Sequence, residues 1–186
     1  AKPKKNGHSK EIGIDRTAKL YIGGKQARPD QGYSFPVFDT RGKQIGEAGA
    51  GNRKDIRNAV EAAHKAASWA KATAHNRAQV LFYIAENLAA RADEFTTRLA
   101  SLTNASDDVA RAEVNLAIER LFTYAAWADK WDGNVHHTPY RNVTLAMPEA
   151  IGVMGIVCPD EAPLLALVSL VAPAIAMGNT VVVVPS

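Results

Sequence analysis

Residues 151–186 read IGVMGIVCPDEAPLLALVSLVAPAIAMGNTVVVVPS, in which two apolar runs flank a longer apolar segment. The runs at 153–157 and 181–184 lack polar alternation, which is typical of parallel strands covered by helices on both faces. Between them, Pro163 can open a helix, because the first helical position needs no N–H, and Gly178-Asn179 can close it. The pattern predicts a βαβ unit with a right-handed crossover.

Short strands are predicted near the N-terminus. Residues 19–28 carry a Gly23-Gly24 pair between two short runs, a recognised hairpin signal. Residues 33–48 repeat the pattern around Thr40-Arg41-Gly42. Two further strands are expected at 143–147 and 150–157.

Helices are predicted between these strand regions, from apolar spacing and capping residues. Asn52 is suited to cap the first, and Ser106 the last, which is expected to run to Trp131. The second helix has an apolar stripe of Leu81, Ile84 and Leu88. The four predicted helices cover roughly 52–69, 75–91, 93–103 and 106–131. The fold class is therefore α/β, with small antiparallel strands and helices leading into a Rossmann-like parallel βαβ unit.

The segment 151–186 resembles the first βαβ unit of the nicotinamide-binding domain of aldehyde dehydrogenases, and the resemblance extends over 18–186. It implies that 18–186 form the N-terminal, cofactor-binding-type part of such a domain, truncated here, after a basic linker or disordered arm at 1–17. The positions that carry it are Gly152, 155–159, Pro163, 172–174, Ala176, 178–180 and 181–186.

The resemblance implies NAD or NADP as the cofactor of the parent enzyme. By family position the residues beside it would be Ile156, Val157, Pro159, Val184 and Ser186.

Two positions depart from the family pattern. After Cys-Pro the family usually has Trp-Asn-Phe-Pro, whose Asn donates to the oxyanion, and here Glu161 occupies that Asn position. The second strand usually ends in Lys-Pro, where the Lys reaches the adenosine ribose, and here Val184 stands in its place. Losing one oxyanion donor costs about 3–4 kcal/mol in the barrier, and an ionised Glu161 would also repel the oxyanion. No catalytic residue is therefore assigned within the chain. One expectation is that this domain binds no cofactor.

The run Cys-Pro-Asp-Glu-Ala-Pro, together with Val-Val-Val-Val-Pro-Ser, resembles the second, non-catalytic domain of aldehyde dehydrogenase family 16. This predicts a degenerate domain with a structural or dimerisation role in a larger aldehyde dehydrogenase. Its partners would be the rest of its own chain, including a catalytic domain, and further copies in a homo-oligomer. The alternative is an active NAD(P)-dependent enzyme that oxidises an aldehyde to a carboxylic acid, with its catalytic Cys and Glu beyond Ser186. In either case, this part is expected to be inactive alone.

Composition narrows the remaining classes. Four of the 22 basic residues lie in residues 1–10, so the body is close to neutral and nucleic-acid binding is not expected. The apolar segment 162–177 is interrupted by Ser169 and Pro173, so no membrane span is predicted. Cys158 is the single cysteine, which indicates a reducing compartment, here the cytoplasm, and a small buried side chain. His136-His137 lacks further ligands at suitable spacing, so a plain loop and no metal site are predicted.

Overall fold

The computed structural model describes residues 4–5 and 17–186. The predicted arm at 1–17 therefore lies almost entirely outside the described residues. Of it, Lys4–Lys5 (β1) pairs antiparallel with Tyr33–Phe38 (β4).

Two antiparallel hairpins open the chain, as predicted. Leu20–Ile22 (β2) pairs with Lys25–Ala27 (β3), and β4 pairs with Gln44–Gly49 (β5). Gly23 and Gly24 have φ values of 61° and 76° between β2 and β3. Positive φ at both central residues suits the twist of a two-residue hairpin and is accessible to glycine at little cost.

The helices follow the predicted order. They are Arg53–Lys65 (α1), the 3₁₀ helix Ala67–Lys71 (η1), Ala74–Ala90 (α2), Ala92–Thr103 (α3) and Asp107–Trp127 (α4). Asn52 caps α1 and Ser106 caps α4, which confirms both predicted caps.

Three details of the helix prediction were wrong. The helix predicted over 52–69 ends at Lys65, and a separate 3₁₀ helix, η1, follows it. α4 ends at Trp127 rather than Trp131, because the chain tightens into a turn in which the Lys130 N–H donates to the Trp127 carbonyl at 3.0 Å. Ile84 is 41% exposed. The buried stripe of α2 consists of Ala78, Leu81, Ala85 and Leu88, and Ile84 lies beside it.

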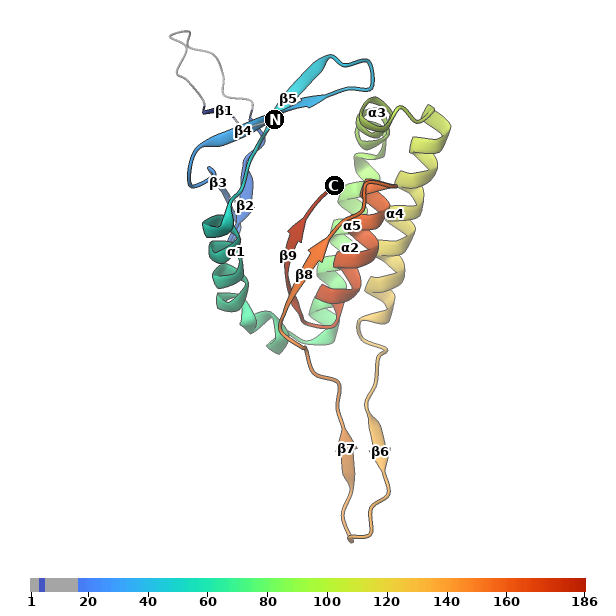
Figure 1. The fold of residues 1–186 in the computed structure, drawn as a ribbon. Helices are drawn as coiled ribbons and strands as arrows, with labels where there is room; N and C mark the ends of the chain where they lie inside the picture. The colour runs from blue at the N-terminus through green and yellow to red at the C-terminus, as the bar shows by residue number, and fades with distance from the viewer. Residues whose placement is uncertain (1–3, 6–16) are drawn as a thin grey trace.

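A long hairpin arm leaves the body after α4. Asn134–His136 (β6) pairs antiparallel with Thr144–Ala146 (β7), and Figure 1 shows the arm extending away from all other elements. The loop predicted at His136 is therefore wrong, since His136 pairs with Thr144 in the strand. β6 escaped prediction because all three of its residues are exposed and no buried face gives it an apolar alternation.

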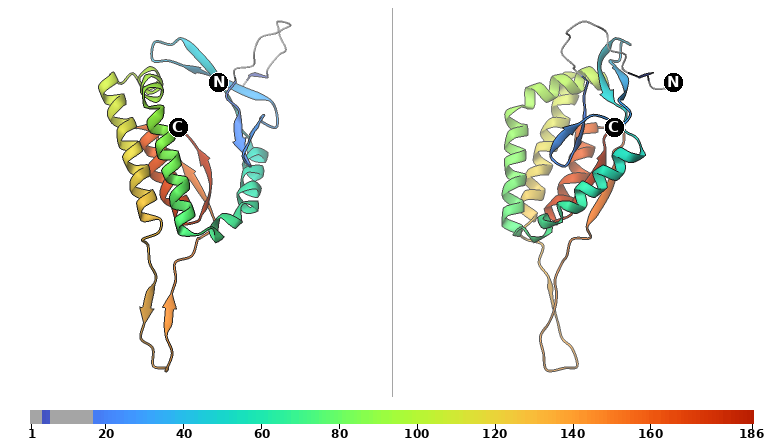
Figure 2. Two further views of the ribbon diagram at one scale, coloured as in Figure 1. Left: turned by 180° about the vertical axis from the view of Figure 1, so that it is seen from behind. Right: turned by 90° about the vertical axis from the view of Figure 1, so that its left-hand side faces the viewer.

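The predicted βαβ unit is present. Val153–Val157 (β8) and Thr180–Val184 (β9) pair in parallel and are joined by Pro163–Ala176 (α5). Pro163 occupies the first turn of α5, as predicted, and Gly178 follows its end with φ 85°. α5 contacts one face of the strand pair and α1 the other, so both faces are covered by helices (Figure 2).

The core lies between α2, α4 and α5. Leu81 of this layer is completely buried, and so is Val114, which belongs to a smaller cluster with Leu99 of α3. The layer also includes Leu121 and Val168, and it fixes α5 in position beneath the two strands.

Candidate functional site

The carboxyl ends of β8 and β9 meet at one edge, because the strands are parallel. Val157 pairs with Val184, and the Cys158 N–H donates to the Val184 carbonyl at 2.9 Å. In doubly wound folds ligands bind outside this edge. The edge is thus the place where the predicted cofactor positions come together.

The five predicted cofactor positions differ in exposure. Ile156 is buried in β8, whereas Val157 is 76% exposed and Val184 is 44% exposed. Pro159 and Ser186 are also exposed, just beyond the strand ends. The strand ends therefore offer apolar surface, and neither valine has a side-chain hydrogen-bond donor.

The loop from β8 to α5 carries Asp160, Glu161 and Ala162. Ala162 adopts a left-handed conformation with φ 46° and ψ 62°. Asp160 and Glu161 are exposed, and within the described part of the chain neither carboxylate has a hydrogen-bond or ion-pair partner. Two carboxylates without such a partner therefore lie beside this edge.

Cys158 is buried, with 7% exposed, as predicted for a small apolar side chain. It lies below the edge, and its backbone N–H serves the strand pairing. Its place in the structure is that of a core residue.

The role of Glu113 was not predicted from the sequence. One of its carboxylate oxygens accepts from the N–H groups of Leu164 and Leu165, at 2.9 and 3.2 Å. The only local signal was the absence of a capping side chain before Pro163, and nothing in the spacing pointed to a residue on α4.

A groove of about 900 Å³ lies beside this edge, between α1 and the free edge of β9; we call it the β9 groove. Apolar side chains from several elements line it, including Leu20 and Ile22 of β2, Ile56, Ala59 and Ala63 of α1, Val181, Val182 and Val183 of β9, and Leu167 and Ile175 of α5. The exposed loop 160–162 and Val157 lie outside it. The lining of this groove is therefore mainly apolar, and none of the five predicted cofactor positions belongs to it.

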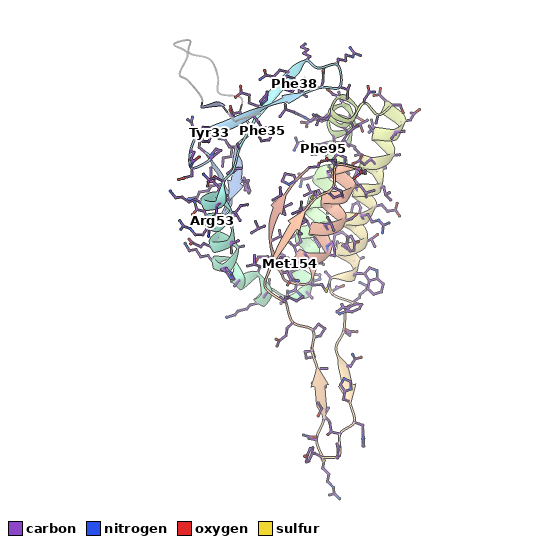
Figure 3. All side chains as sticks on the ribbon, viewed as in Figure 1. Tyr33, Phe35, Phe38, Arg53, Phe95 and Met154 are labelled. Atoms are coloured by element: carbon purple, nitrogen blue, oxygen red, sulfur yellow. The ribbon has the colours of Figure 1, made fainter. Side chains whose placement is uncertain are left out.

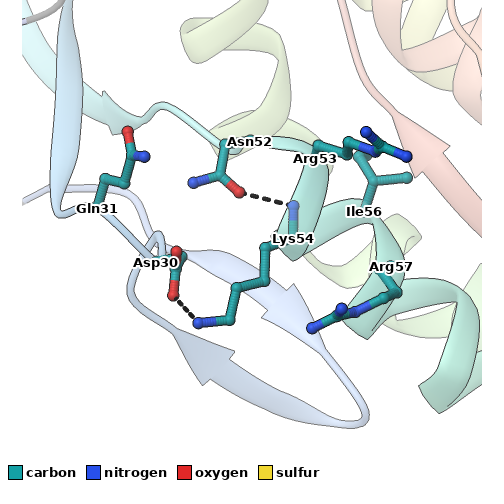
Figure 4. A pocket seen from close by; sticks show the side chains of 7 residues that line it. All are labelled: Asp30, Gln31, Asn52, Arg53, Lys54, Ile56 and Arg57. Carbon is teal, nitrogen blue, oxygen red and sulfur yellow. Dashed lines mark hydrogen bonds and ion pairs between the residues drawn. The ribbon is translucent and has the colours of Figure 1, made fainter.

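A second hollow, of about 680 Å³, lies at the start of α1 (Figure 4). Lys54 forms an ion pair with Asp30, and its hydrogen bond lowers the pKa of the Asp30 carboxyl. The Asn52 side chain accepts from the Lys54 N–H at 2.8 Å. The charged groups here and the first N–H groups of α1 are thus already partly satisfied within the protein.

The described residues contain no group of three or more His, Cys, Asp or Glu side chains placed to hold a metal ion. Over the same residues, no helix is both long enough and apolar enough to cross a membrane.

Comparison with known proteins decides the family. The model of the aldehyde dehydrogenase family matches residues 28–186. The chain belongs to this family. Among curated members, the mouse cytosolic 10-formyltetrahydrofolate dehydrogenase is 30% identical over 95% of the chain, which covers 21% of that protein. The hydroxyisobutyraldehyde dehydrogenase of Mycolicibacterium austroafricanum is 33% identical over 90% of the chain and 34% of its own length.

Solved aldehyde dehydrogenases share the fold. HpcC from Thermus thermophilus has a TM-score of 0.86 and 29% identity, over 90% of this chain and 33% of that one. The betaine aldehyde dehydrogenase of Staphylococcus aureus, solved as a double mutant with NAD+, has a TM-score of 0.88 at 22% identity, over 90% and 34%. The chain therefore spans between a fifth and about a third of the length of these relatives.

Proposed function

We propose that this chain is a degenerate, non-catalytic aldehyde-dehydrogenase domain segment with a structural or dimerisation role in a larger aldehyde dehydrogenase. The observation that carries the proposal is the chemistry of the edge above β8 and β9. Glu161 is exposed and unpaired among the described residues, where the family resemblance places an oxyanion donor. Val184 ends β9 without a donor for a ribose. The likeness to the second domain of family 16 supports the same interpretation.

The test is calorimetric titration of NAD and NADP into this sequence within its full-length protein. We expect no binding attributable to this domain, because the edge offers carboxylates and apolar side chains to an anionic dinucleotide. The double variant Glu161→Asn, Val184→Lys restores the family residues and serves as the matched comparison. Micromolar binding to the domain without these replacements would overturn the proposal.

The alternative function is that of an active NAD(P)-dependent aldehyde dehydrogenase, which would convert an aldehyde to a carboxylic acid. The observation in its favour is the fold, which overlays on the Staphylococcus aureus enzyme solved with NAD+ at a TM-score of 0.88. Its catalytic Cys and Glu would have to come from outside residues 1–186. Under either function we place the protein in the cytoplasm, since its single cysteine suits a reducing compartment.

The structural role centres on the β6–β7 arm. Its paired residues Val135 and Leu145 are 74% and 58% exposed, and Tyr140 near its tip is 76% exposed. Figure 3 shows its side chains extending into open space with no other element of the chain beside them. A lone two-stranded hairpin is marginally stable in water, so a partner surface that covers this apolar arm would stabilise it.

We propose that the arm packs against a second copy or against a catalytic domain of the same chain. In the full-length protein, Val135→Asp should convert a dimer into monomers in light scattering coupled to size exclusion. Val109→Asp, at an exposed position of α4, is the matched control. A dimer that is insensitive to Val135→Asp would count against the arm as the interface.

A further inference from the structure

Helix α5 begins without a capping side chain of its own. Ala162 precedes it, with no hydroxyl, amide or carboxyl group, and no side chain in the N-cap position caps it. Pro163 has no N–H, so the first donors that need an acceptor are the N–H groups of Leu164 and Leu165. The first bond that closes the helix itself is that of the Ala166 N–H with the Ala162 carbonyl, at 2.8 Å.

Glu113 provides the missing cap from another helix. Its Oε1 accepts from the Leu164 N–H at 2.9 Å and from the Leu165 N–H at 3.2 Å. The two partners lie 51 and 52 residues later in the chain. α4 and α5 lie side by side in the core layer, and Glu113 directly precedes the completely buried Val114 (Figure 1). Its backbone is therefore anchored by core packing.

The opposite end of α5 is held in the complementary way. Arg77 Nε donates to the Ala176 carbonyl at 2.8 Å, and Trp69 Nε1 donates to the Ile175 carbonyl at 2.9 Å. A carboxylate at the N-terminus and a guanidinium at the C-terminus both match the sign of the helix dipole. Side chains from outside α5 thus fix both of its ends.

The loop 159–162 is tied to these anchors. On one side it continues from β8, where the Cys158 N–H donates to the Val184 carbonyl. On the other side it enters α5 through Ala162, which holds a left-handed conformation that costs a residue with a Cβ about 1 kcal/mol or more. Such a conformation persists only where the surrounding structure imposes it. The hydrogen bond from the Leu164 N–H to Glu113, two residues after Ala162, is such a constraint.

We propose that Glu113 is the positioning residue of the 159–162 loop: from α4 it caps α5 and so holds Asp160, Glu161 and Ala162 in their observed arrangement. In doubly wound folds, the N–H groups at the start of this helix face the phosphates of a dinucleotide. Here the Glu113 carboxylate accepts the hydrogen bonds of these N–H groups. The proposal stands apart from the question of whether the full-length protein binds NAD.

The test is amide hydrogen exchange of this sequence within its full-length protein, resolved by NMR of selectively labelled amides, in Glu113→Ala, Glu113→Gln and the control Glu119→Ala. Glu119 lies on the same helix, is exposed and has no side-chain partner within the described residues. In Glu113→Ala we expect exchange at Leu164 and Leu165 to rise at least about tenfold, which corresponds to about 1.4 kcal/mol, while amides within α4 keep their rates. Glu113→Gln retains an acceptor oxygen and should recover most of the protection. Glu119→Ala should match the parent chain.

Two results would overturn the proposal. One is unchanged exchange at Leu164 and Leu165 in Glu113→Ala. The other is a uniform rise across α4 and α5 in both Glu113 variants, since that would make Glu113 a general stabiliser rather than a local cap. Amide resonances of Asp160, Glu161 and Ala162 provide the second readout: we expect them to shift in Glu113→Ala and to return toward the parent positions in Glu113→Gln.

Discussion

Asp55 is the only charged residue among the described residues that is buried, with 5% exposed. Its carboxylate accepts from the Asn52 N–H at 2.9 Å and from the Asp30 N–H at 3.1 Å. The first bond completes the capping box of α1, and the second joins α1 to the loop after β3. A buried carboxylate is tolerated when backbone donors satisfy it in this way.

Asp55→Ala should therefore be costly, because it leaves the two N–H groups without their charged acceptor. We expect the free energy of unfolding to fall by roughly 2–3 kcal/mol in urea denaturation followed by circular dichroism. Asp107→Ala is the control, since Asp107 lies in the first turn of α4, is exposed and makes no side-chain hydrogen bond among the described residues. It should lose only the interaction with the helix dipole, about 0.3–1 kcal/mol. Equal losses in the two variants would refute this account of Asp55.

The roles of residues that act on positions nearby in the sequence could be predicted. Asn52, Ser106 and Pro163 act on the helix that follows each of them, so the order of residues reveals the role. The bond between Asp55 and Asp30 spans 25 residues, and that between Glu113 and Leu164 spans 51. Such pairs depend on how helices and loops meet in space, which local spacing does not encode. The roles of Glu161 and Val184 rest on family resemblance and stay predictions.

At the scale of elements, α3 starts without a side-chain hydrogen-bond cap and depends on charges in its first turns. Glu94 pairs with Arg91 at 2.8 Å and with Arg98 at 3.0 Å. The hydrogen bond from Arg91 is the main reason that the pKa of Glu94 lies below its ordinary value of 4.5. Desolvation is the next largest effect and opposes the shift, and the hydrogen bond from Arg98 lowers the pKa further. The two arginines are largely exposed and Glu94 is partly exposed, so salt should weaken these pairs.

Because the folded pKa of Glu94 lies below the unfolded one, its contribution to stability is present above about pH 4.5 and is lost as the pH falls through the folded value. Glu94→Gln should therefore reduce the drop in melting temperature between pH 7 and pH 3, most clearly at low salt. Glu119→Gln, which removes an exposed carboxylate without an ion pair in the described part of the chain, is the control. An acid-induced drop that stays the same in Glu94→Gln would exclude Glu94 as a contributor.

Elements marked by an apolar pattern or by a turn signal were predictable, and β6, which has neither, was not. α2 shows its apolar stripe in Leu81 and Leu88, and the valines of β9 indicate a strand covered on both faces. β6 has no buried residue, so neither alternation nor apolar content marks it. The end of α4 was misplaced for a related reason, since Trp131 is 64% exposed and the apolar periodicity does not settle where the last turn lies.

At the scale of the whole molecule, the parallel pairing of β8 and β9 followed from sequence, but the β9 groove did not. The groove depends on how α1 and β2 approach the sheet (Figure 2). Within the described residues β9 pairs only with β8, so its other edge is unpaired and lies in an apolar groove. An unpaired, apolar strand edge is a template for pairing with another chain.

The 186-residue chain on its own should therefore form assemblies that grow with concentration, through the β9 edge. Light scattering over a concentration series should show this growth, in contrast to the single dimer expected from the arm in the full-length protein. Val182→Lys places a charge in the β9 groove and should suppress the growth. Val109→Lys, on the exposed face of α4, should leave it unchanged. Circular dichroism establishes that both variants keep the helical content, and equal growth in both would show that the association uses another surface.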